Sequence, residues 1–206
     1  MSNDHDYTRT KLFIDGQWVD SDGTGTIEVI DPATEKVCGC VPAGSEADVD
    51  AAVTAARAAF DPLISVTERR ERLDAVITAM EKRLPAIAET ITREMGAPIR
   101  IAQSVQTQVP LAVARGFADA LATFEFEEKI GNSLVVREPY GVVAAITPWN
   151  YPLYQVVAKV LPAIAAGCTV VLKPSNEAPL SVFEFVDALE AAGLPPGVVN
   201  LVSGPG

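Results

Sequence analysis

The sequence predicts an α/β fold with a doubly wound, Rossmann-like parallel sheet, and two observations in its last third support this prediction. Three short apolar segments have the nearly continuous hydrophobic character of strands that are buried on both faces: Val142–Ile146, Thr169–Lys173 and residues 198–202. Two helical segments separate these strands, residues 152–166 and 179–192, and a glycine follows each of them. Two consecutive βαβ units place the ligand site of such a sheet at the carboxyl ends of its strands.

The chain is expected to begin with a small β element. Residues 11–19 alternate apolar and polar side chains around Asp15 and Gly16, a pattern that indicates a hairpin. Residues 26–30 are rich in β-forming side chains and predict another strand before the turn at residues 31–32.

Helices are predicted from Ser45 onwards, where hydrophobic side chains begin to recur at helical spacing. Ser45 and Ser65 each precede an acidic residue by three positions, so a capping box and a helix start are expected at both. Val49 belongs to the apolar face of the first helix. Pro85 is expected to start a third helix, because proline is favoured in the first turn of a helix.

The region between the helices and the parallel sheet carries less regular signals. Residues 101–124 are predicted to form a helix that bends at Pro110, with Val109 on its buried stripe. The charge run at residues 125–128 is interpreted as a solvated turn, and residues 133–137 as a short β segment.

Composition and charge exclude several classes of partner. The chain is 49% hydrophobic and 21% charged, which is ordinary for a globular protein. Its net charge of −11 disfavours nucleic acid, which is bound by clustered basic residues. No apolar segment is long enough to span a membrane, and residues 1–11 lack the apolar core of a signal peptide, so a cytoplasmic location is expected.

The three cysteines are not expected to form disulfides or to bind a metal. An odd number of cysteines without an export signal argues against a disulfide framework. Cys38 and Cys40 form a single Cys-x-Cys pair with one distant histidine, which is too few ligands for zinc. Cys168 is interpreted as a small buried hydrophobic residue.

The segment after the first predicted strand contains two prolines and side chains that could take part in catalysis. In Thr147-Pro148-Trp149-Asn150 and the residues after it, the prolines restrict the backbone and so fix the directions of the neighbouring side chains. A rigidly held amide such as that of Asn150 can donate a hydrogen bond to an oxyanion. The same residue can instead cap the following helix, and spacing alone favours the cap.

The loops after the second and third strands carry a lysine and a glycine pair. Lys173 can donate to a ribose hydroxyl or a phosphate in the crevice of such a sheet, or it can extend from the strand end into water. Spacing leaves both interpretations open. Gly204 and Gly206 form a G-x-G at which the backbone can approach a pyrophosphate, but an isolated G-x-G is a weak signal.

The order and spacing of these segments resemble the N-terminal portion of the aldehyde dehydrogenase superfamily, about the first two-fifths of a typical member. The segments that carry the resemblance are Phe13-Ile14-Asp15-Gly16-Gln17-Trp18-Val19, Asp31-Pro32-Ala33-Thr34, Asp48-Val49-Asp50-Ala51-Ala52-Val53, Glu94-Met95-Gly96, Ile146-Thr147-Pro148-Trp149-Asn150-Tyr151-Pro152 and Lys173-Pro174-Ser175. By this resemblance, residues 1–124 and 141–206 are expected to be parts of an incomplete coenzyme-binding domain. Residues 125–140 are expected to form a β connector that is similar to part of the family's oligomerisation element.

The resemblance implies a role for each residue that matches a family motif. The family amide that corresponds to Asn150 stabilises the oxyanion formed on a catalytic cysteine, and the lysine that corresponds to Lys173 contacts the adenosine ribose of NAD or NADP. The other expected cofactor-binding residues are Ile146, Thr147, Pro148, Trp149, Pro174, Ser175, Asn176, Gly204 and Gly206. The catalytic cysteine and the general-base glutamate of the family have no counterpart in this chain.

The function that the resemblance implies is NAD(P)-dependent oxidation of an aldehyde to a carboxylic acid by a homo-oligomeric parent protein, whereas the isolated chain is expected to be inactive. Two alternatives are a non-catalytic nucleotide-binding or interaction module and an acyl-phosphate or acyl-thioester reductase of the same superfamily. The apolar strand at residues 198–202 is interpreted as a cut sheet edge, which argues against a complete module. Asn176 stands where the family often has glutamate, which predicts better tolerance of NADP.

Overall fold

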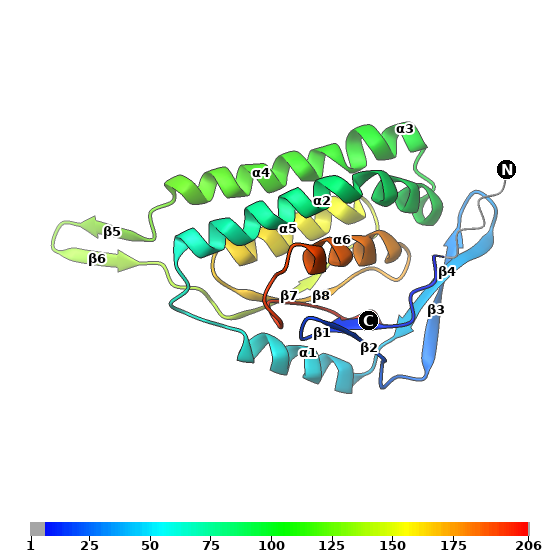
Figure 1. The fold of residues 1–206 in the computed structure, drawn as a ribbon, viewed down its shortest axis with the longest axis horizontal. Coiled ribbons are helices and arrows are strands. Elements are labelled where there is room, and N and C mark those ends of the chain that lie inside the picture. Colours follow the sequence, from blue (N-terminus) through cyan, green and yellow to red (C-terminus); the bar gives the residue numbers. More distant parts are fainter. Residues whose placement is uncertain (1–6, 206) are drawn as a thin grey trace.

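A five-stranded sheet with helices on both faces organises the structure, a computed structural model that describes residues 7–205 (Figure 1). The strand order is β2-β1-β9-β8-β7. The strands are β1 (Leu12–Ile14), β2 (Gln17–Val19), β7 (Val142–Ile146), β8 (Thr169–Lys173) and β9 (Val199–Leu201). Because β7, β8 and β9 run parallel to one another, the predicted α/β fold with a parallel sheet is confirmed.

The helices form layers above and below this sheet (Figure 1). Two helices join the parallel strands and lie on one face, α5 (Pro152–Ala165) and α6 (Leu180–Ala191), whereas α1 (Glu46–Ala58) packs on the opposite face. A further layer covers α5 and α6 and consists of α2 (Val66–Met95) and α4 (Gln108–Thr123). The main hydrophobic core lies between these layers and includes the fully buried Phe183.

The N-terminal hairpin is part of the main sheet, which the sequence did not predict. Strand β1 pairs with β9 in the antiparallel sense, so β9 has a neighbour on each side. The side chain of Asn200, fully buried in β9, accepts from the backbone N–H of Asp15 at 2.9 Å and donates to the carbonyl of Gly197 at 2.9 Å. The interpretation of residues 198–202 as a cut edge was therefore wrong, because the hairpin covers that edge.

Two further hairpins lie outside the main sheet (Figure 1): β3 (Gly25–Asp31) with β4 (Lys36–Ala43), and β5 (Glu127–Ile130) with β6 (Ser133–Val136). The solvated turn predicted at residues 125–128 was wrong in part, since Glu127 and Glu128 belong to β5. Glu127 lies opposite Val136 and Glu128 opposite Val135 in the antiparallel pair, so the backbone groups on the facing edges of the two strands bond to one another.

The helix predicted to begin at Pro85 is instead the second half of α2, which starts after its cap Ser65 and continues to Met95. Pro85 lies on the exposed side of α2, where water can satisfy the carbonyl that has lost its N–H partner. On the opposite side, buried residues continue across the proline, from Met80 through Leu84 to Ile87. Packing of this continuous stripe outweighs the local cost of the proline.

The helical region at residues 101–124 is also arranged differently from the prediction. A short helix α3 (Ile99–Ile101) leads into a π-helical segment η1 (Ala102–Gln106), and α4 follows. The irregularity therefore precedes Pro110, which lies in the first turn of α4, where its missing N–H is not needed. Val109 is 44% exposed rather than buried, because a π-helical turn holds an extra residue and rotates the stripe.

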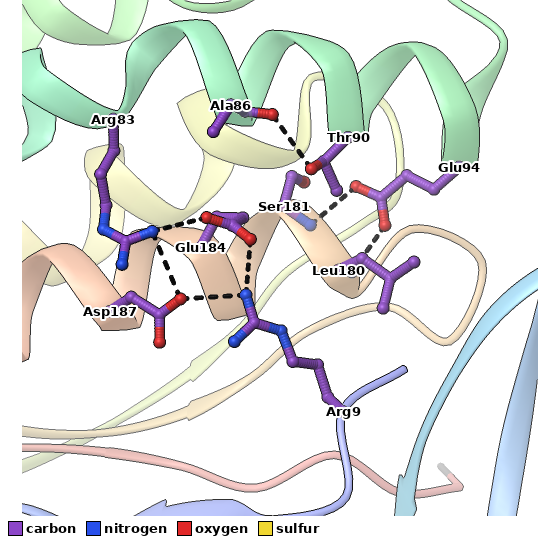
Figure 2. A network of polar contacts seen from close by, with 9 residues as sticks. All are labelled: Arg9, Arg83, Ala86, Thr90, Glu94, Leu180, Ser181, Glu184 and Asp187. Carbon is purple, nitrogen blue, oxygen red and sulfur yellow. Dashed lines mark hydrogen bonds and ion pairs between the residues drawn. The ribbon is translucent and has the colours of Figure 1, made fainter. Parts of the chain in front are cut away.

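A network of charged and polar groups fastens the N-terminal segment to α6 and α2 (Figure 2). Arg9 donates to Glu184 at 2.5 Å and to Asp187 at 2.9 Å, and Arg83 donates to Glu184 at 2.7 Å. Beside this group, the buried carboxyl of Glu94 accepts from the first N–H groups of α6 at 2.6 and 3.0 Å. A side chain of α2 thus caps α6.

Candidate functional site

The carboxyl ends of β7, β8 and β9 border a cleft of about 340 Å³. Strand register places Ile146 opposite Lys173, and the N–H of Thr147 donates to the carbonyl of Lys173 at 3.0 Å, so the first two loops leave the sheet side by side. Three of the predicted site residues line this cleft, namely Ile146, Lys173 and Gly204. The cleft lies where a parallel sheet of this kind binds its ligands.

Lys173 projects into this cleft from the end of β8 and is partly buried. Burial lowers the pKa of its ammonium group. None of the described residues forms an ion pair with this side chain. Its charge is therefore available to a ligand. Of the two interpretations of Lys173, the structure supports a side chain that lies in the ligand cleft over one that extends freely into water.

Asn150 does not cap α5, so the interpretation favoured by spacing alone was wrong. The N-cap position is occupied by Tyr151, and no side chain forms a cap hydrogen bond there. Tyr151 has φ 54° and ψ 55°, a left-handed conformation that costs a non-glycine residue about 1–2 kcal/mol. Strained backbone of this kind clusters at functional sites. The side-chain amide of Asn150 is exposed and makes no cap hydrogen bond to α5.

The other predicted site residues lie on the loops beside the cleft but do not line it. Thr147 is 4% exposed, and its hydroxyl has no hydrogen-bond partner among the described residues. Pro148 and Trp149 are exposed on the same loop. On the loop after β8, Pro174 is buried, Ser175 accepts from the N–H of Glu177, and Asn176 is half-buried. Gly206 lies outside the described residues.

The N-terminal turn of α1 forms a wall of the cleft that the sequence did not indicate. This wall consists of Gly44, Ser45, Glu46 and Val49. The N–H of Gly44 donates to the carbonyl of Ser203 at 2.8 Å, and a Cβ atom at Gly44 would lie only 2.5 Å from that oxygen. The contact joins segments that are distant in sequence, so local patterns do not predict it. The glycine at position 44 is the feature of the sequence that fits this close approach.

None of the described cysteines lies beside Asn150. Cys168 directly precedes β8 and so lies at the amino end of the parallel strands, whereas Asn150 follows their carboxyl ends. Cys168 is buried, as predicted. Cys38 and Cys40 belong to β4, and burial raises the pKa of the Cys38 thiol.

Residues 7–205 contain neither a metal-binding cluster nor a membrane-spanning helix. These residues contain no group of three or more histidine, cysteine, aspartate or glutamate side chains that could hold a metal ion. None of the helices in the same part of the chain is long and apolar enough to cross a membrane.

Comparison with known proteins gives consistent matches along almost the whole chain. The model of the aldehyde dehydrogenase family matches residues 18–206. A 3-succinoylsemialdehyde-pyridine dehydrogenase from a Pseudomonas species is 48% identical over 204 residues, which cover 95% of this chain and 42% of that protein. The chain therefore spans less than half the length of this relative.

Solved structures show the same relationship. An aldehyde dehydrogenase C mutant from Pseudomonas syringae, crystallised with NAD+ and octanal, is 47% identical with a TM-score of 0.94, covering 97% of this chain and 42% of that one. An NADP-dependent enzyme from E. coli is 30% identical with a TM-score of 0.88, covering 97% of this chain and 43% of that one.

Proposed function

Because this chain belongs to the aldehyde dehydrogenase family, we propose that a protein containing it oxidises an aldehyde to a carboxylic acid with NAD or NADP. One observation carries the proposal. The side-chain amide of Asn150 does not cap α5, and it lies on the loop beside the cleft that contains Lys173. The relatives crystallised with NAD+ or described as NADP dependent support the choice of cofactor.

The residues of the cleft fit a nicotinamide dinucleotide. Lys173 offers an unpaired ammonium group for ribose hydroxyls or phosphate, and Ile146 and Val49 offer apolar surface to a base. Gly204 has no side chain to obstruct a phosphate. A Cβ atom at this position would also lie only 3.1 Å from the carbonyl oxygen of Gly44. When bound, the nicotinamide supplies the acceptor for a hydride.

Asn150 is assigned to the substrate carbonyl. An N–H donor that is held in place before the reaction stabilises the negative charge that develops on that oxygen when a nucleophile adds to the carbon. The left-handed backbone at Tyr151 sets the direction in which the loop that carries Asn150 enters α5. The substrate class, an aldehyde, follows from the family relationship.

The 206-residue chain by itself is expected to show no turnover, because none of its described cysteines lies beside Asn150 to add to an aldehyde. The measurement is NAD(P)H formation at 340 nm with purified chain and a panel of aldehydes. Turnover by pure chain would contradict the assignment. Calorimetry with NAD on the same material tests the alternative of a non-catalytic nucleotide-binding module. Such a module must bind the cofactor by itself, whereas a chain that spans 42% of its relative is expected not to bind it.

Homo-oligomer formation is proposed through the hairpin β5–β6. Its apolar side chains are exposed, with Ile130 at 57% and Leu134 at 61%, and apolar surface of this kind is typical of protein contacts. Sedimentation of a protein of the relatives' full length that contains this chain tests this assignment, because Leu134→Lys should weaken the assembly.

Asn176 is expected to make NADP more acceptable than a glutamate at this position would. The amide is uncharged, whereas a carboxylate would repel the 2′-phosphate. In a protein of the relatives' full length that contains this chain, Asn176→Glu should therefore raise the NAD-to-NADP ratio of kcat/KM about tenfold. The matched control is Asn176→Gln, which has the same length as glutamate and no charge. Equal ratios for the two variants would refute the prediction.

A further inference from the structure

Strand β7 forms one edge of the five-stranded sheet. Among residues 7–205, the only strand that pairs with β7 is β8, which runs parallel to it over its whole length. At the two ends of this pair, the N–H of Thr147 donates to the carbonyl of Lys173, and the N–H of Thr169 donates to the carbonyl of Gly141. The residues that flank β7 therefore direct these backbone groups towards β8.

The residues at the even positions of β7 direct their backbone groups to the other side. The N–H and C=O groups of successive residues point alternately to the two sides of a strand. Val142, Ala144 and Ile146 therefore present these groups to the open edge of the sheet. The side chains of Ala144 and Ile146 are also exposed, that of Ile146 at 65%.

Three other strands at sheet edges have features that discourage pairing, and β7 has none of them. Strand β2 is only three residues long, and three of the four residues of β5 are charged. The N-terminal segment covers the open side of β4, where the N–H of Arg9 donates to the carbonyl of Cys40 at 2.8 Å. Short strands, charges and covering segments protect an edge from other chains. Val142–Ile146 contains only apolar residues, without proline or glycine.

The sequence of β7 is complementary to itself. When two β7 strands run antiparallel about a twofold axis at Ala144, Val142 of each copy lies opposite Ile146 of the other. Opposed residues of this kind exchange both of their N–H···O=C bonds, so every backbone group on the open edge gains a partner. All the opposed side chains are apolar, and no like charges face each other.

We propose that two copies of the 206-residue chain associate through their β7 edges and so join their two sheets into one. The inference uses the backbone of the edge and does not depend on the proposed function. It also differs from association through the hairpin β5–β6, which is a separate exposed apolar surface. Because Ala144 and Ile146 line the cleft that contains Lys173, the second copy lies at the border of that cleft.

Amide hydrogen exchange of the 206-residue chain, resolved by residue and measured at increasing protein concentration, tests this pairing. The N–H groups of Val142, Ala144 and Ile146 should exchange more slowly as the concentration rises. Those of Val143 and Ala145 point towards β8 and should be protected at every concentration. Sedimentation of the same samples should show a transition from the mass of one copy to the mass of two.

Substitutions test which surface is responsible. Ala144→Lys places two ammonium groups opposite each other at the twofold axis, so the dissociation constant of the dimer should rise about tenfold. Ala144→Pro removes an outward N–H, a change that an edge strand tolerates, and should weaken the dimer as well. The matched control Ala112→Lys adds the same charge at an exposed alanine of α4 and should leave the constant unchanged. Leu134→Lys, on the hairpin, should also leave it unchanged.

Several results would overturn the proposal. One is a chain that stays monomeric up to about 1 mM. Another is association that Leu134→Lys abolishes and Ala144→Lys leaves intact, because the hairpin is then the interface. Protection of the outward N–H groups that does not depend on concentration would also overturn it, since the edge is then covered within one copy. Circular dichroism shows whether each variant has folded, and the exchange measurement needs only the original chain.

Discussion

Replacement of Asn150 by alanine is expected to lower kcat about 10²- to 10³-fold in a protein of the relatives' full length that contains this chain, the typical cost of removing one oxyanion donor. The KM for NAD should change little, because Asn150 does not line the cleft that holds Lys173. Steady-state kinetics with a saturating aldehyde measures both quantities.

The stability of the 206-residue chain separates this role from that of a helix cap. Loss of a cap costs about 0.5–2 kcal/mol, whereas Asn150 makes no cap hydrogen bond to α5. We therefore expect Asn150→Ala to leave the free energy of unfolding within about 0.5 kcal/mol of the original value, as for other exposed sites. Asn150→Asp provides the control, since aspartate caps well but repels an oxyanion. Activity retained by the aspartate variant would contradict the catalytic role.

The stability of the chain is expected to fall by roughly 2 kcal/mol between pH 5.5 and 8 because of Glu94 alone. Burial raises the pKa of this carboxyl from its ordinary value of 4.5 to about 7, and the bonds from Ser181 and Leu180 oppose the rise without cancelling it. Since the folded-state pKa lies above the unfolded one, the stabilisation is complete below pH 4.5 and is lost as the pH rises through about 7.

Urea unfolding at several pH values tests this expectation. Glu94→Gln replaces the carboxyl with a group of the same shape that does not titrate, so the original chain should lose stability relative to this variant as the pH rises. The control is Glu89→Gln, which removes an exposed carboxylate from the same helix. A difference between the original chain and Glu94→Gln that stays constant from pH 5.5 to 8 would contradict the prediction.

Much of the fold could be predicted because its signals are local. The capping boxes at Ser45 and Ser65 and the apolar strands β7 and β8 lie where the sequence places them. Predictions failed where a local preference competed with packing. Pro85 is a favoured first residue of a helix, but a continuous buried stripe carries α2 through it.

The candidate site shows the same division. The order of the strands and the residues after them identified Lys173 and Gly204 as parts of one edge of the sheet, and the structure places both in one cleft. The sequence did not indicate the wall formed by Glu46 and Val49. That wall depends on the bond between Gly44 and Ser203, which joins residues about 160 positions apart.

By itself, the sequence determined the α/β class, the succession of parallel strands and the resemblance to aldehyde dehydrogenases, because repeated apolar segments, caps and short motifs are read from neighbouring residues. Only the tertiary structure decided whether Asn150 caps α5, which edge of the sheet the hairpin covers and which turn of α1 lines the cleft that contains Lys173. Each of these depends on the backbone conformation or on contacts between distant segments, where packing and hydrogen bonding of the whole chain outweigh local spacing.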